Sequence, residues 1–275
     1  MGLSSILVIA AVFSIFNFGF KQGIDFVGGT LWEVKSDVKI VQSVLPKEAM
    51  VTPGSNNSLL VRLPELSETD HQKYVEEIKK QDSQFEELSF ESIGPAVGQE
   101  LRKKAVYAFV AVLLIISLYI AFAFRKVSFP VKSWKYGVVT LVTLFHDALV
   151  PAGLMAFLGS LNNIEVGTNF IVALLVVMGF SVHDTIVVFD RIRENIKLEK
   201  SRNFHFANLV NRSVNETMAR SINTSLTLVL VLVALLFLGS ANLYYFVLVI
   251  LVGTVMGTYS SIFVASPLLT LLTKN

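Results

Sequence analysis

The stretch SVHDTIVVFDRIREN, residues 181–195, decides how the rest of the sequence is interpreted. It begins inside an apolar run long enough to cross a membrane, yet it carries His183 and Asp184 before it reaches a charged end. An ionised carboxylate at mid-helix costs roughly 2.5–3.5 kcal/mol on insertion scales, so such acids usually face a bundle interior or water. Asp184 therefore predicts an ion path or a helix-helix contact within a membrane bundle.

The composition places the whole chain among membrane proteins. Hydrophobic residues make up 53% of its 275 residues and charged residues only 16%, a balance that is unusual for a soluble domain. Cysteine is absent, which excludes disulfides, thiolate nucleophiles and cysteine-based metal sites. The first apolar run lacks a basic segment before it and a small-residue cleavage site after it, so we expect it to be retained as a membrane span.

The arrangement of apolar runs predicts a six-helix membrane bundle. A bilayer core about 30 Å thick needs about 20 apolar residues in helical form. Lys and Arg concentrate in two loops and are absent from two short turns, at 160–168 and 240–241, and basic residues stay in the cytoplasm. We therefore expect both termini and the basic loops to be cytoplasmic. The predicted spans are 3–20, 105–124, 136–159, 169–190, 220–239 and 242–272.

These assignments divide the chain into three parts. We expect a first transmembrane helix over 1–20, an external domain over 21–103, and a five-helix bundle over 104–275 with cytoplasmic loops at 125–135 and 191–219. Residues 21–100 hold 8 basic and 14 acidic residues, as expected of a solvated module. The sequence pattern there predicts strands near 28–36, 48–53, 58–63 and 85–93, helices near 37–45 and 67–80, and a turn at 53–57.

The order of these elements, βαββαβ, favours a small ferredoxin-like α+β domain. Ser67 and Asp70 fit an N-cap with an acid at the third position of the second helix. The predicted fold class is therefore a helical membrane protein in which a six-helix half-bundle carries one external α+β domain.

Two arginines are candidate partners for Asp184. Arg220 stands at the cytoplasmic start of the fifth span, where it either pairs with the acid or snorkels to the interface. Arg191 follows Asp184 by seven residues and lies on the same helix face. Our hypothesis is that one of them holds the ionised carboxylate, and that protonation breaks the attraction and lets the helices shift.

A second polar pair, His146 and Asp147, lies near the centre of the third span. Because histidine titrates near neutral pH, His146, His183 and the two acids form a candidate proton relay. Alternatively, they are structural contacts between helices. A shared metal site is disfavoured because adjacent helical residues point about 100° apart. No nucleophile stands beside a base, so we expect no enzymatic activity, no metal and no cofactor.

Glycine patterns mark two further segments. Gly253, Gly257 and Ser261 recur every four residues in the sixth span, which favours close helix packing. In GIDFVGGT, Asp25 and the pair Gly28–Gly29 lie where the first span gives way to the external domain. Glycine at this point predicts either a positive φ or a close backbone crossing. The segment is not a phosphate loop, since no helix with a lysine follows it.

Six segments in order along the chain resemble the SecD/SecF family of bacterial protein-export membrane proteins, in its SecF branch, within the resistance-nodulation-division (RND) transporter superfamily. The external domain between 31 and 90 matches only in length and pattern. The segments are GIDFVGGT at 23–30, ESIGPAVGQELRKKA at 91–105, FHDAL at 145–149, SVHDTIVVFDRIREN at 181–195, ARSINTS at 219–225 and GTYSSIFVASPLL at 257–269.

The resemblance implies an inner-membrane subunit that pairs with SecD into a twelve-helix unit beside the SecYEG channel, with YajC and YidC as further partners. That unit uses the proton gradient to help draw the unfolded preprotein across the membrane. The family's proton-carrying acid and arginine fall on Asp184 and Arg220. His183 stands where many relatives carry asparagine. The expected surroundings are membrane lipid, and no nucleic-acid partner is implied.

Two other functions fit the same bundle. An RND-type exporter of small molecules or lipids predicts a second, larger external domain in the same chain, whereas this chain has one small domain. A non-transporting scaffold predicts that the external module is a docking surface and that the intramembrane acids are dispensable. The scaffold is separated from a proton-coupled subunit by replacing Asp184 with asparagine.

Overall fold

The computed structural model describes residues 1–275 except 55–56, 126–129, 163, 200–203, 240–242 and 274–275. The chain divides into two compact units. The helical unit comprises 1–21, 107–164 and 169–275, and the α+β unit comprises 22–106 together with 165–168. The short segment 165–168 thus belongs with residues far from it in sequence, although it leads directly into a helix of the other unit.

The α+β unit contains the predicted elements in the predicted order. The four strands form one antiparallel sheet with the order β2-β3-β1-β4. Two residues of the turn expected at 53–57, namely 55 and 56, lie outside the described residues. The elements are β1 (Gly29–Lys35), α3 (Val38–Val44), β2 (Met50–Pro53), β3 (Leu59–Leu63), α4 (Glu68–Gln81) and β4 (Glu86–Ile93).

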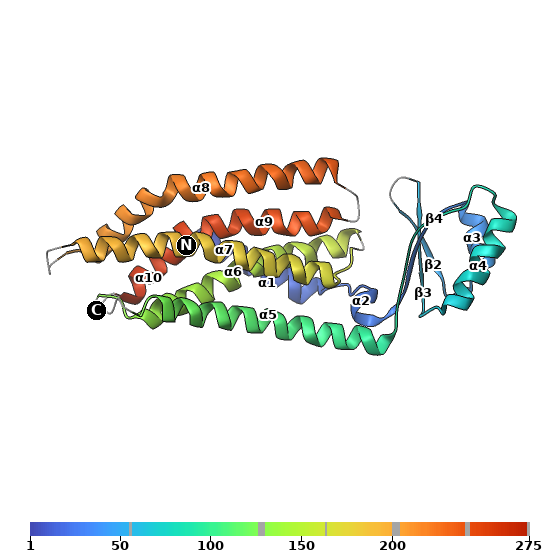
Figure 1. Ribbon diagram of the computed structural model, residues 1–275, viewed down its shortest axis with the longest axis horizontal. Coiled ribbons are helices and arrows are strands. Elements are labelled where there is room, and N and C mark those ends of the chain that lie inside the picture. The colour runs from blue at the N-terminus through green and yellow to red at the C-terminus, as the bar shows by residue number, and fades with distance from the viewer. Residues whose placement is uncertain (55–56, 126–129, 163, 200–203, 240–242, 274–275) are drawn as a thin grey trace. The chain divides into compact units, whose positions relative to one another are not determined.

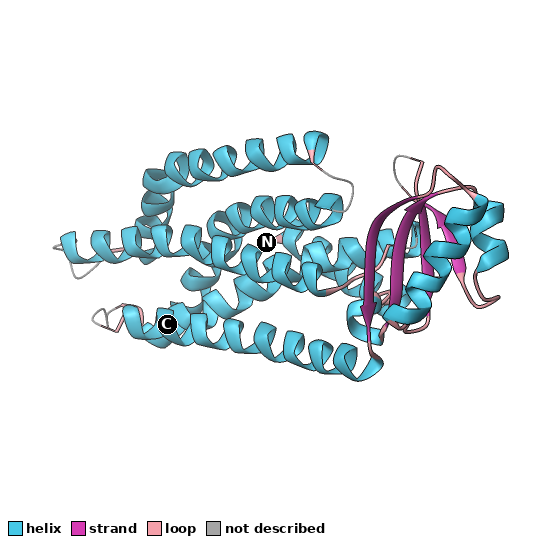
Figure 2. Ribbon diagram, turned by 45° about the vertical axis from the view of Figure 1, so that its right-hand side comes forward, coloured by secondary structure: helices cyan, strands magenta, loops and turns pink. Residues whose placement is uncertain are grey.

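The core of the α+β unit lies between the sheet and its two helices, which cover the same face (Figure 2). Alternate residues of β3 are buried, as expected for a strand with one covered face. Trp32 of β1 is fully buried and meets Phe90 edge-to-face with ring centroids 6.3 Å apart. Ile78 of α4 is also fully buried and completes this cluster.

Polar contacts fix both ends of α4. The predicted cap at its start is confirmed, because the Ser67 hydroxyl accepts from the Asp70 amide at 3.2 Å. At its end, Asp82 accepts from the Ser36 hydroxyl at 2.6 Å and from the Gln84 amide at 2.9 Å. Asp82 therefore ties the end of α4 to the turn between β1 and α3.

This contact predicts an acid-sensitive α+β unit. Hydrogen bonds, chiefly from the Ser36 hydroxyl and then from the Gln84 amide, hold the pKa of Asp82 below its ordinary value. Their contribution to stability is present above the unfolded pKa of about 3.9 and is lost as the pH falls below it. We expect Asp82→Asn to lower stability at neutral pH and to weaken its dependence on acid. Thermal unfolding, followed by Trp32 fluorescence in a Trp134→Phe background, measures this; identical pH profiles for both proteins would contradict it.

The helical unit is built from long apolar helices (Figure 1). Among the described residues, five helices are long and apolar enough to cross a membrane, the last being the combined run Tyr244–Thr273. The first helix is apolar but has only 17 residues. The helices are α1 (Gly2–Phe18), α5 (Pro95–Ala123), α6 (Ser133–Asn162), α7 (Thr168–Leu198), α8 (Phe206–Leu238), α9 (Tyr244–Ser260), the π-helical turn η2 (Ser261–Ala265) and α10 (Ser266–Thr273).

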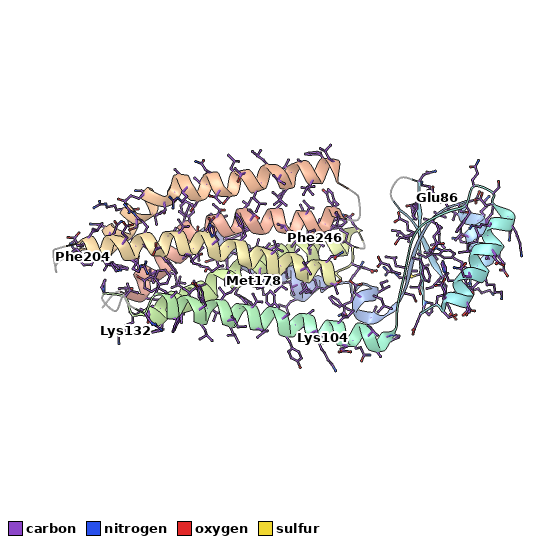
Figure 3. All side chains as sticks on the ribbon, in the orientation of Figure 1. Glu86, Lys104, Lys132, Met178, Phe204 and Phe246 are labelled. Atoms are coloured by element: carbon purple, nitrogen blue, oxygen red, sulfur yellow. The ribbon has the colours of Figure 1, made fainter. Side chains whose placement is uncertain are left out.

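Apolar side chains cover the outer faces of the bundle as well as its interior. Side chains project outward along α5 and α8 (Figure 3), and α6 and α9 are more deeply buried than these two helices. Such wide exposed apolar faces are expected where lipid or another membrane subunit replaces water. Large exposed apolar residues on α5 and α8 include Tyr107, Ile115, Leu118, Tyr119, Leu230, Val231, Phe237 and Leu238.

Two local features were not predicted from the sequence. The short helix α2 (Ile24–Val27) precedes the glycine pair, and its single turn is too short to produce a periodic pattern. In the last span, α9 is followed directly by η2, and the chain continues beyond Pro267 as α10. Proline has no backbone N–H to donate, and a widened π turn just before it is one way for a helix to continue through such a residue.

Candidate functional site

Asp184 of α7 lies inside the helical unit, where only 1% of its surface is exposed. Its Oδ2 accepts from the Ser225 hydroxyl of α8 at 3.2 Å and from the Thr258 hydroxyl of α9 at 3.1 Å. Those two hydroxyl oxygens are themselves 2.5 Å apart. The carboxyl group therefore joins three helices through neutral donors. Because hydroxyls do not neutralise a buried negative charge, this arrangement suits the protonated acid.

Asp147 of α6 is the centre of a second and more completely bonded cluster. Its exposed fraction is 0%. The Oδ2 atom accepts from the Ser181 hydroxyl of α7 at 2.5 Å and from the Ser260 hydroxyl of α9 at 2.6 Å. The Oδ1 atom lies 2.8 Å from His146 Nδ1. The Asp147 carboxyl group therefore joins α6 to α7 and α9.

Small residues let α7 and α9 approach closely enough for these contacts. A Cβ atom on Gly253 would lie 2.2 Å from Val177 Cγ2, and one on Gly257 would lie 2.9 Å from Ser181 Cβ. Neither clash can be relieved without moving α7 or α9. Ser261, the third residue of the pattern, is buried at the start of η2. Helix packing thus positions the hydroxyls of α9 against both carboxyl groups.

The two carboxyl clusters share their helices. Ser181 and Asp184 lie one turn apart on α7, while Thr258 and Ser260 lie at the end of α9, immediately before η2. A movement of either helix therefore changes both clusters together. Single π-helical turns in α-helices occur frequently at functional sites, and this one directly follows the Asp147 donor Ser260.

Neither arginine that we considered is paired with Asp184 in this structure. Arg191 donates from Nε to Glu216 and from Nη1 to Glu194, at 2.6 Å in each case. Two helical turns, about 10.5 Å, separate Arg191 from Asp184 along α7, which is too far for direct contact. The side chain of Arg220 is exposed on α8, and no ion pair joins it to Asp184 among the described residues.

His183 and His146 differ in their surroundings. The side chain of His183 is exposed on α7, next to Asp184. His146 is only 5% exposed, and its Nε2 has no hydrogen-bond partner within the described part of the chain. His146 Nδ1 lies 2.8 Å from Asp147 Oδ1, so Nε2 is the ring nitrogen that points away from this contact. The residues that the structure describes contain no group of three or more potential metal ligands.

The hydroxyl donors were not predicted from the sequence. Serine and threonine are common in membrane helices because they bond to their own backbone, so nothing in the pattern distinguished the bonding ones. The segments ARSINTS and GTYSSIFVASPLL did contain them. The four donors to the two carboxyl groups are Ser181, Ser225, Thr258 and Ser260.

Removing the Asp147 carboxyl group is expected to loosen the bundle. Asp147→Ala removes three buried hydrogen bonds, and at about 0.6 kcal/mol for each bond in a membrane the loss is about 2 kcal/mol. Asp147→Asn keeps a carbonyl oxygen for the two hydroxyls, so it should lose less. Thermal unfolding of the full chain in lipid nanodiscs measures the difference, and equal midpoints for wild type, Asn and Ala variants would refute the assignment.

The Asp25 motif lies in the α+β unit. Gly28 and Gly29 have φ values of 81° and 122°, so the predicted positive φ occurs at both. The predicted close crossing also occurs, because a Cβ on Gly28 would lie 2.6 Å from Pro95 Cα at the start of α5. Asp25 Oδ2 accepts from the amide and the hydroxyl of Thr168, the first residue of α7, at 2.6 and 2.7 Å.

Comparison with known proteins gives family matches over most of the chain. The model of the C-terminal region of protein export membrane protein SecD/SecF matches residues 73–275, and the SecD/SecF GG motif matches 13–39. The chain is 42% identical to protein translocase subunit SecF of Thermobaculum terrenum over 97% of its own length and 89% of that protein. It is 35% identical to the SecF subunit of Sebaldella termitidis over 98% of its own length and 88% of that protein.

A solved structure is also similar. The crystal structure of SecDF, a translocon-associated membrane protein from Thermus thermophilus, aligns with a TM-score of 0.82 and 37% sequence identity. The alignment covers 98% of this chain and 37% of the SecDF chain. The chain therefore spans little more than a third of that protein.

Proposed function

The chain belongs to the SecD/SecF family of protein-export membrane proteins, and from this membership we propose that it is the SecF-type subunit of a Sec translocase. The sequence identity of 42% and 35% to SecF subunits, which extends over nearly the full length of this chain, supports this assignment. Because SecF-like and SecD-like parts share one chain in SecDF, a SecD subunit is the partner that would supply the remaining helices. Together the two subunits would use the proton-motive force to promote preprotein translocation.

We further infer the arrangement of the chain in the bacterial inner membrane. The apolar helix α1 and the five longer helices support six spans, with both termini in the cytoplasm. The division into two compact units supports domain boundaries close to the proposed 1–20, 21–103 and 104–275, with the segment 165–168 assigned to the α+β unit. The strand order β2-β3-β1-β4 supports a ferredoxin-like topology for the external domain. SecYEG, YajC, YidC and lipid remain the proposed neighbours.

The mechanism rests on two states of Asp184. In the first state Asp184 is protonated, and its carboxyl group keeps the contacts with the hydroxyls of α8 and α9. Loss of the proton creates a buried charge, which needs either water or a cation. Arg220 is the nearest candidate along α8, five residues before Ser225. The proposal is that ionised Asp184 exchanges its hydroxyl partners for the Arg220 guanidinium.

This exchange requires a change in α8. The inner face of α8 carries Ser221 and Ser225, which are buried, whereas Arg220 is exposed. Successive helical residues point about 100° apart, so a rotation of up to that angle would turn Arg220 toward Asp184. The long arginine side chain reduces the rotation needed. The Ser221 hydroxyl has no partner among the described residues, so it would not oppose this movement.

The remaining polar residues provide a proton route. His183 is exposed beside Asp184, and His146 has a buried Nε2 directed away from Asp147. Protons would pass among His146, Asp147, His183 and Asp184, with Arg191 holding the cytoplasmic ends of α7 and α8 together through Glu216. One charge crossing 100 mV releases about 2.3 kcal/mol, so a few protons per cycle could drive a domain movement.

The observation that carries this mechanism is the buried Asp184, whose carboxyl group contacts hydroxyls of two other helices and, among the described residues, no cation. Its test is export of a preprotein into inverted membrane vesicles depleted of this chain and then resupplied with it. We expect resupply to increase export only while a proton gradient is present. A gain that persists after an uncoupler collapses the gradient would instead support a scaffold.

A further inference from the structure

One set of contacts in the α+β unit, which the mechanism above does not use, joins the first residues of the unit to the start of α7. We call this set of contacts the α7 latch, and define it as Gln22, Gly23 and Asp25 bound to residues 165–168. Gln22 forms a parallel bridge with Val166, and the Gly23 amide donates to the Val166 carbonyl at 3.0 Å. These backbone contacts hold the loop between α6 and α7 within the α+β unit.

Asp25 completes the latch through its side chain. Its Oδ2 accepts from Thr168 N at 2.6 Å and from Thr168 Oγ1 at 2.7 Å. The first amides of a helix have no partner within the helix, and a carboxylate there also interacts favourably with the helix dipole. Asp25 thus caps α7 from a segment 143 residues earlier in the chain.

Two other residues of the segment 165–168 support the contact between Asp25 and Thr168. A Cβ on Gly167 would lie 2.4 Å from Asp25 Oδ2, so any larger residue there would displace the carboxylate. At the start of the segment 165–168, Glu165 forms an ion pair with Arg62 of β3. Arg62 and Glu165 are both partly buried. The loop is therefore attached to the α+β unit at three places, by backbone, carboxylate cap and ion pair.

Helix α7 connects this latch directly to the proton site. It runs without a break from Thr168 to Leu198, and Asp184 lies about 24 Å from Thr168 by the helical rise. A continuous helix transmits a shift along its length better than a loop. The first residue of α7 belongs to the α+β unit and the rest to the helical unit.

We propose that Asp25 is a positioning residue that couples movement of α7 at the proton site to movement of the external domain. The inference rests on the proposed function. It gives the carboxylate of Asp25 a function that is distinct from proton transfer and from folding of the domain. Without the cap, α7 would still respond to protonation of Asp184, but the response would not reach the α+β unit.

The test separates coupling from proton movement. The chain, co-reconstituted in proteoliposomes with its SecD partner and the translocon, is assayed for gradient-driven export and for proton uptake. We expect Asp25→Ala to lower export about tenfold, as for loss of a charge-assisted hydrogen bond, and to leave proton uptake unchanged. Asp25→Asn, which keeps an acceptor for Thr168, should retain most of the export. The matched control is Glu91→Ala, an exposed carboxylate of β4, which should match wild type.

A covalent replacement of the latch provides the second readout. Since the chain has no native cysteine, Gln22→Cys with Val166→Cys in the Asp25→Ala background allows a disulfide across the bridge. Oxidation should restore export and reduction should abolish it again. If the Asp25→Ala protein does not accumulate in the membrane, Gly167→Ala is used instead. This variant retains Asp25 but pushes its carboxylate away from Thr168, so the same loss of export is expected.

The outcomes distinguish this inference from the proposed function. Wild-type export by Asp25→Ala, loss of proton uptake along with export, or no rescue by the disulfide would each overturn the coupling role. An Asp184→Asn variant measured in parallel should lose both activities. If that variant keeps gradient-driven export, the proposed function itself fails, whatever the Asp25 variants do.

Discussion

Asp184→Asn is expected to abolish gradient-driven export while leaving the bundle folded. The asparagine carbonyl can accept from the Ser225 and Thr258 hydroxyls as the acid does, so helix packing should persist. The amide cannot ionise, and the exchange of hydroxyl partners for Arg220 cannot occur. Export with a proton gradient should fall to the level seen without one, a decrease of about tenfold or more, as expected when an intramembrane charge site is lost.

Asp190→Asn is the matched control for this experiment. Asp190 lies on the same helix but is exposed and pairs with Arg193 at 2.6 Å, and an exposed pair contributes at most about 1 kcal/mol. Export by this variant should equal that of wild type. Equal export by the Asp184 variant, with the partner still bound, would exclude a proton-coupled role and favour a scaffold.

Gly28→Ala is expected to lower the thermal stability of the α+β unit far more than replacement of a glycine in ordinary helical conformation. Gly28 has φ 81° and ψ 169°, a region essentially restricted to glycine, where another residue costs about 1–3 kcal/mol. The added Cβ would also lie 2.6 Å from Pro95 Cα, and a backbone atom cannot rotate away. Both costs act together, so the midpoint of Trp32 fluorescence unfolding should fall by many degrees, and the amount of accumulated protein should fall with it.

The control is Gly179→Ala in α7, where a Cβ would meet nothing within 4 Å. Alanine there should be neutral or slightly stabilising, because it favours helix over glycine. If both variants unfold at the same temperature, the close crossing at Gly28 does not determine the stability of the unit. The same comparison explains why glycine occupies this position of the GIDFVGGT segment.

Local patterns were enough to predict most secondary structure. The alternation in β3, the cap at Ser67 and the long apolar runs each reflect interactions within a few residues, and the corresponding elements are confirmed. The single-turn helix α2 and the π turn η2 leave no such pattern. Element bounds also differ, since helices α5 to α8 extend beyond the apolar runs into polar sequence.

The candidate site was only partly predictable, because its contacts join distant residues. Asp184 and Asp147 stand out as acids in apolar runs, and Asp25 and Gly28 as part of a motif. Their partners depend on which segments meet in the folded chain. Asp25 and Thr168, for example, are 143 residues apart in the sequence. The charges in the sequence therefore favoured Arg191 and Arg220 as partners, whereas the packed bundle presents hydroxyls to Asp184.

Infrared difference spectroscopy of the reconstituted complex across a pH step reports the protonation of Asp184 itself, because a carboxylic acid and a carboxylate absorb at different frequencies. We expect a carboxylic-acid carbonyl band that disappears as the pH rises, is missing in Asp184→Asn, and shifts in frequency in Ser225→Ala, which removes one hydroxyl donor. A spectrum in which no pH-dependent band is lost on replacing Asp184 would contradict the claim that this residue gains and releases the driving proton.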